Sequence, residues 1–98
     1  MGNQFASDKE LLILCLLSTQ PNGMYGLELI KASDERLKRG TVYVTLGRME
    51  EKGFVRSRID KDGPRKHPGL PRPRYRITAL GARALSAAQL MGLLPAEA

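Results

Sequence analysis

The stretch GTVYVTLGRMEEKGFV, residues 40–55, decides the fold of this chain. On a period of 3.6 residues, Val42, Leu46 and Met49 fall on one apolar stripe. Gly53 closes the pattern, as glycine often does at the end of a helix. The stretch therefore predicts an amphipathic helix that runs directly into an apolar, strand-like pair of residues.

A second stripe on the same helix carries short hydroxyls and long cations. It lies roughly 120° round from the apolar stripe and consists of Thr41, Thr45, Arg48 and Lys52. Side chains of these types reach base edges and phosphates in a DNA major groove, where Val44 would touch a thymine methyl. Many surface helices carry a similar polar stripe that only faces solvent. Evidence from the neighbouring segments is therefore needed to distinguish a DNA-recognition face from an ordinary solvent-exposed one.

Length and charge narrow the class of protein. A chain of 98 residues predicts one domain, small enough that burying more apolar surface in a dimer would add stability. Half of the sixteen Lys and Arg lie in residues 56–76 with only two acidic residues, and the rest of the chain is balanced. A basic excess confined to one segment indicates a polyanionic partner.

The segment before this helix predicts two shorter helices. Ser7 and Glu10 fit a capping box, and the run 11–17 that follows is apolar all round, so it should be buried by its own core and by another subunit. Cys15 in that run indicates a buried thiol rather than a redox sensor, and a lone cysteine excludes an internal disulfide. Residues 20–23 supply the turn that ends this helix.

A second helix is predicted over residues 24–32, with Leu27 and Ile30 inward and Leu29 at the margin. Gly26 early in it suggests that another backbone approaches closely. The polar residues 33–39 connect it to the helix of the opening stretch. Two helices joined in this way to a third form a helix-turn-helix pattern.

After the third helix, residues 54–59 and 74–78 alternate as strands do. The inner side is predicted to carry Val55, Ser57, Ile59, Tyr75 and Ile77, and the open side Phe54, Arg56, Arg58, Arg74 and Arg76. Residues 60–71 contain three Pro and two Gly and cannot be regular structure. Strand, loop and strand predict a hairpin, or wing, with arginines on its open face. The cations expected to lie along phosphates flanking the groove are Lys38, Arg39, Arg65, Lys66, Arg72 and Arg74.

Thr78 caps a last predicted helix whose apolar positions repeat at four and three residues. This stripe could pack on the chain's own domain, but three helices and a hairpin offer little further surface to receive it. We therefore expect a subunit interface, to which the first helix also contributes. The predicted interface residues are Leu12, Leu16, Leu80, Ala84, Ala87, Met91 and Leu94.

Four motifs resemble the PadR family of bacterial winged-helix transcriptional regulators. They are Tyr25-Gly26-Leu27-Glu28-Leu29; Gly40-Thr41-Val42-Tyr43 with Leu46, Arg48, Met49, Glu50, Gly53 and Phe54; Gly69-Leu70-Pro71-Arg72-Pro73-Arg74-Tyr75; and Thr78-Ala79-Leu80-Gly81. The resemblance implies a cytoplasmic homodimer that represses transcription from an operator. Some relatives bind flat aromatic ligands against a tryptophan, which this chain lacks, so an effector stays open.

The expected fold is thus mainly α with a small β-hairpin: a winged helix-turn-helix DNA-binding part over residues 1–78 and a dimerisation helix over 79–98. Double-stranded DNA and a second copy of the chain are the predicted partners, with no cofactor, no metal and no membrane. No nucleophile with a base, paired carboxylates or metal cluster suggests an enzyme, and His67, the only histidine, lies in the proline-rich loop. The alternative is a winged helix that binds RNA or docks a protein; clustered arginines with a single aromatic favour duplex phosphates.

Overall fold

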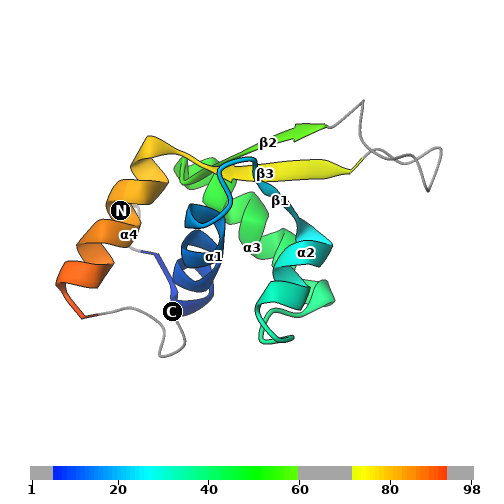
Figure 1. Cartoon of the computed structure of the whole chain (residues 1–98), viewed down its shortest axis with the longest axis horizontal. Helices are drawn as coiled ribbons and strands as arrows, with labels where there is room; N and C mark the ends of the chain where they lie inside the picture. Colours follow the sequence, from blue (N-terminus) through cyan, green and yellow to red (C-terminus); the bar gives the residue numbers. More distant parts are fainter. Residues whose placement is uncertain (1–5, 60–71, 93–98) are drawn as a thin grey trace.

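The computed structural model describes residues 6–59 and 72–92. Its elements are α1 (Asp8–Ser18), β1 (Met24–Tyr25), α2 (Gly26–Ala32), α3 (Arg39–Lys52), β2 (Val55–Ile59), β3 (Pro73–Ile77) and α4 (Ala79–Leu90). The strands form an antiparallel sheet in the order β1-β3-β2. Figure 1 shows this sheet along the upper edge of the molecule, with α1, α2 and α3 below it and α4 beside α1. The predicted winged helix-turn-helix class is confirmed.

The start of α1 has the capping box that the sequence predicts. The Ser7 hydroxyl accepts the Glu10 amide at 3.3 Å, and the Glu10 carboxylate accepts the Ser7 amide at 2.8 Å. Residues 11–14 and Leu17 behind this cap are buried. The helix is therefore the central element of the core, in agreement with its apolar character all round.

The helix α3 lays its predicted apolar stripe on that core, where Val42, Leu46 and Met49 are fully buried. Gly53 ends it in the left-handed conformation, with φ at 84°, which favours glycine because a Cβ there strains the backbone. Phe54 and Val55 then enter the core at the start of β2. The apolar stripe of α3 and its end at Gly53 are confirmed. Two neighbouring predictions are wrong, because Phe54, expected on the open face with the arginines, is buried, and Ile59, expected inward, is 43 % exposed.

The predicted second helix is wrong at its start. Met24 and Tyr25 form β1, paired with Tyr75 and Arg74 of β3, and the helix begins at Gly26. Its inward face also differs, because Leu29 is fully buried whereas Leu27 is 37 % exposed. Leu29 therefore takes the inward place predicted for Leu27, beside the half-buried Ile30.

Gly26 is a site of close approach, as predicted, but by a side chain rather than a backbone. A Cβ at this position would lie 2.5 Å from the Tyr43 ring of α3. The glycine thus lets α2 and α3 pack closely. Between them, Asp34 and Glu35 adopt positive φ angles, and the buried Ser33 hydroxyl accepts the Leu37 amide, which fixes the turn of the helix-turn-helix unit.

The start of α4 is joined tightly to the end of α3. The Thr78 amide donates to the Phe54 carbonyl at 3.0 Å, and the Thr78 hydroxyl donates to the Gly53 carbonyl while it accepts the Gly81 amide. The predicted Thr78 cap is confirmed. Farther along α4, Leu85 and Ala88 are buried in the core.

Candidate nucleic-acid interface

The outer face of α3 carries three of the predicted recognition residues in the open. Thr41 and Arg48 are exposed, and Val44 is 56 % exposed. Thr45 is half-buried, and its hydroxyl donates to the Thr41 carbonyl at 2.9 Å. The hydroxyl proton is thus used within the helix, which leaves the Thr45 oxygen as an acceptor and its methyl group as an apolar contact.

Two further residues of α3 are exposed but lie on another side of the helix. The Tyr43 ring, which packs over Gly26, keeps 43 % of its surface exposed. Gly47 lies next to Arg48 in open space, where a Cβ would meet no atom within 4 Å. Because a mid-helix glycine costs about 1 kcal/mol relative to alanine and no neighbour requires it, Gly47 offers a place where another molecule can approach the helix backbone.

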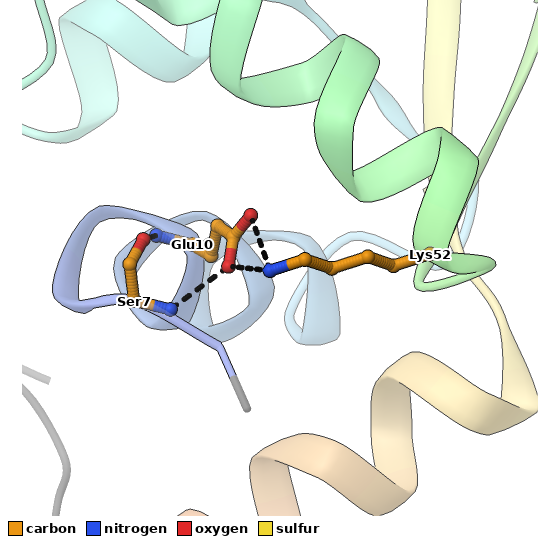
Figure 2. A network of polar contacts seen from close by, with 3 residues as sticks. All are labelled: Ser7, Glu10 and Lys52. Atoms are coloured by element: carbon orange, nitrogen blue, oxygen red, sulfur yellow. Dashed lines mark hydrogen bonds and ion pairs between the residues drawn. The ribbon is translucent and has the colours of Figure 1, made fainter. Parts of the chain in front are cut away.

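Lys52, the fifth predicted recognition residue, lies elsewhere. Its ammonium nitrogen is 2.9 and 3.1 Å from the two carboxylate oxygens of Glu10, the residue that also caps α1 (Figure 2). The Glu10 side chain is only 3 % exposed and that of Lys52 26 %. The ammonium also lies 5.7 Å from the centre of the Phe54 ring. These contacts favour a structural role for Lys52, fastening the end of α3 to the start of α1.

We expect Lys52→Met to destabilise the fold more than Glu10→Gln. The first change leaves a buried carboxylate without its cation, which costs roughly 3 to 5 kcal/mol in fully buried pairs and less here, where Lys52 is partly exposed. The second keeps the capping box, which accepts glutamine, and leaves a lysine that water can reach. Urea denaturation of both variants and of the double variant measures the order.

If Lys52→Met proved as stable as the parent and instead reduced the salt dependence of DNA binding, the sequence prediction of a phosphate contact would hold and the structural role would be wrong.

The flanking cations divide into three groups. Lys38, Arg39 and Arg72 are exposed, as phosphate contacts require. Arg74 is half-buried, with its guanidinium carbon 4.5 Å from the centre of the Tyr25 ring and a 2.9 Å hydrogen bond to the Tyr25 hydroxyl. Arg65 and Lys66, together with His67, lie outside the described residues.

The residues predicted to form the dimer interface differ in how exposed they are. Leu80 on α4 is 45 % exposed, Met91 just after the helix is 60 % exposed, and Ala87 of α4 is also exposed. Leu16 and Ala84 are half-buried against the core. Leu12 is only 7 % exposed, so its own chain already covers most of the surface that was predicted to meet a partner. Leu94 lies outside the described residues.

Burial raises the pKa of two side chains, Cys15 and Tyr75. Cys15 is half-buried rather than fully buried as predicted. Desolvation raises the pKa of its thiol, which keeps it protonated and poorly nucleophilic at neutral pH. Burial, followed by the charge of Glu50 and by Tyr43, raises the pKa of Tyr75. In the described ranges, no three His, Cys, Asp or Glu side chains are grouped to hold a metal ion. None of the described helices has the length and apolar character needed to cross a membrane.

Comparison with known proteins places these features in a family. The model of the transcriptional regulator PadR-like family matches residues 13–87. A crystal structure of a PadR family transcription regulator from Clostridium difficile is 30 % identical, with a TM-score of 0.71, over 87 % of this chain and 86 % of that one. A protein described as a transcriptional regulator from Thermoplasma acidophilum is 31 % identical, with a TM-score of 0.70, over 86 % and 80 %.

The fold is also that of PadR from Bacillus subtilis, whose crystal structure is in complex with operator DNA. That protein is 20 % identical, with a TM-score of 0.70, over 84 % of this chain and 46 % of its own. A search of curated proteins found no match.

Proposed function

This chain belongs to the PadR-like family of transcriptional regulators, and we propose that it is a cytoplasmic repressor that binds a pseudo-palindromic operator as a homodimer. The observation that carries this proposal is the outer face of α3, where Thr41, Val44 and Arg48 are exposed side by side. A face of hydroxyl, methyl and guanidinium groups on a helix matches the chemistry of base edges. The operator complex of the Bacillus subtilis relative supports it.

The flanks of α3 suit the phosphates on either side of a major groove. Lys38 and Arg39 lie exposed at the start of the helix, and Arg72 lies exposed just before β3. In this proposal they position the helix, together with Arg65, Lys66 and Arg74, and carry affinity more than sequence preference. Thr41, Val44, Thr45 and Arg48 read the bases.

The dimer would form through α4. Leu80 and Met91 expose large apolar side chains on one side of this helix, while Leu85 and Ala88 on the next side pack on the chain's own core. An exposed apolar stripe that continues a core is typical of a subunit interface. Residues 79–98 would thus join two copies, and residues 1–78 of each would bind a half-site.

We expect Arg48→Ala to weaken operator binding by roughly 1 to 3 kcal/mol per half-site and to relax preference at one base position, because a bidentate arginine contact to guanine is lost. Gln89→Ala, at an exposed residue of α4 on the side away from Leu80 and Met91, is the control and should leave both unchanged. Fluorescence anisotropy with operator and random duplexes measures the effect.

Equal losses for Arg48→Ala on operator and random DNA would count against base reading by this residue. Absence of duplex binding by the unmutated protein, with capture of RNA or of a protein partner instead, would favour the other uses of a winged helix.

A further inference from the structure

Two separate contacts hold the C-terminal end of α3. On one side, the Lys52 ammonium lies 2.9 and 3.1 Å from the two carboxylate oxygens of Glu10, at the start of α1. On the other side, Thr78 donates its amide to the Phe54 carbonyl and its hydroxyl to the Gly53 carbonyl, just before α4 begins. The last residue of α3 and the two that follow it are thus attached to two different helices.

These two helices are the ones proposed to form the dimer. They pack against each other, with α4 beside α1 (Figure 1). Leu80, which is 45 % exposed on the proposed interface, has its Cδ2 atom 3.3 Å from the position that a Cβ on Gly53 would take. The surface proposed to meet the second copy therefore lies next to the end of α3.

The ion pair adds a fixed point that apolar packing does not provide. The buried stripe of α3 contributes most of its burial, but hydrophobic contact is non-directional, whereas a hydrogen-bonded ion pair has a defined geometry. Figure 2 shows the Lys52 side chain extended from the end of α3 to the Glu10 carboxylate. Glu10 is itself held, because the same carboxylate accepts the Ser7 amide at 2.8 Å and is only 3 % exposed.

A helix attached at one point can still tilt, and a second attachment on another element fixes its direction. We infer that Glu10 and Lys52 are positioning residues for DNA recognition. Their ion pair fixes the tilt of α3 against α1 and α4, and it thereby sets the spacing of half-sites that the dimer accepts. The inference rests on the function proposed above and deepens it. Neither side chain contacts DNA in this arrangement.

The two-fold symmetry of a dimer makes the spacing sensitive to this tilt. Any change in the direction of α3 in one protomer is repeated in the other, so it alters the separation of the two helices from both sides. One base pair of spacer corresponds to about 3.4 Å along the duplex and about 35° around it. A small tilt of each helix is therefore enough to change which spacer fits.

The test measures affinity for operators whose spacer is one base pair shorter or longer than the preferred one. The unmutated protein should bind the preferred spacer roughly tenfold more tightly, because the other duplexes must be twisted to fit. Glu10→Gln and Lys52→Met should each reduce this ratio to roughly threefold, since α3 can then adopt more than one direction. Base preference within each half-site should stay unchanged.

Three features of the design separate positioning from other effects. Glu10→Gln keeps the capping box and removes no cation, so it cannot act through a lost phosphate contact. Lys52→Arg keeps a cation within reach of Glu10 and should restore the ratio of the unmutated protein. Ile30→Val trims a half-buried side chain of α2, which lowers stability away from residues 52–54 and should leave the ratio unchanged.

An unchanged spacer ratio in Glu10→Gln and Lys52→Met would overturn the inference. So would an equal fall of the ratio in Ile30→Val, which would make it a consequence of lower stability. If Lys52→Met weakened binding to every spacer equally and reduced the salt dependence while Glu10→Gln had no effect, Lys52 would be a phosphate contact and not a positioning residue.

These failures are distinguishable from failure of the proposed function. If the unmutated protein binds a pseudo-palindromic operator and Arg48→Ala alters base preference, but neither Glu10→Gln nor Lys52→Met changes the spacer ratio, only the positioning role is wrong. An unmutated protein that bound all spacers equally would also contradict it, while base reading by α3 would stand. If the unmutated protein binds no duplex at all, both proposals fall.

Discussion

Replacing Gly81 with alanine is expected to destabilise the fold by about 3 kcal/mol. A Cβ on Gly81 would lie 2.2 Å from the Phe54 carbonyl oxygen and 3.0 Å from Ile77 Cγ1. The carbonyl is backbone and is fixed by the hydrogen bond from the Thr78 amide, so it cannot move without separating α4 from the end of α3. We expect a loss of at least about 3 kcal/mol, the upper range for an inserted methyl group, from a small domain with little stability to spare.

Gly47→Ala in α3 is the matched control. A Cβ at this position meets nothing within 4 Å, so the substitution should stabilise the protein by about 0.5 to 1 kcal/mol through helix propensity. Circular dichroism during urea denaturation compares the two variants. A Gly81→Ala protein as stable as the parent would show that the joint between Phe54 and α4 is looser than described.

The second large effect is expected at the proposed dimer interface. Leu80→Glu with Met91→Glu should convert the protein to monomers, because two carboxylates would be buried against their own copies across a two-fold axis. Operator affinity should fall by roughly 10² to 10⁴, since a monomer loses the effective concentration that links two half-sites. Sedimentation and operator titration measure the two quantities.

Ala82→Glu with Gln89→Glu provides the control. Both residues are exposed on α4 and lie on the side away from Leu80 and Met91, so they add the same charge without entering the stripe. Similar loss of dimers in both double variants would show that charge alone disrupts assembly. An unmutated protein that sediments as a monomer at micromolar concentration would contradict the interface on α4.

The sequence predicts the fold well where a local signal and the core agree. The Ser7 capping box, the stripe of Val42, Leu46 and Met49, and the C-cap at Gly53 are each local patterns whose physics is complete within a few residues. The structure confirms all three. The hairpin strands could be predicted for the same reason, because alternation places Tyr75 inward without knowledge of the partner strand.

The features that could not be predicted from the sequence depend on contacts between residues far apart in the chain. Met24 and Tyr25 form a strand because β3, which is distant in the sequence, lies beside them, and two residues are too few for any periodic pattern. Lys52 has the spacing of the polar stripe of α3, but it forms an ion pair with Glu10 of α1 instead. The pairing of arginines across β2 and β3 likewise becomes visible only once the register of the hairpin is known.

The most direct test of this account is selection of binding sites from random duplex DNA by the unmutated protein. A homodimer that presents two α3 helices to successive major grooves should enrich a pseudo-palindromic motif, with half-site centres about 34 to 36 Å apart along the duplex. The same selection with Arg48→Ala should lose information at one symmetric pair of positions. Enrichment of no motif, with binding that depends only on salt and duplex length, would contradict sequence-specific recognition by α3.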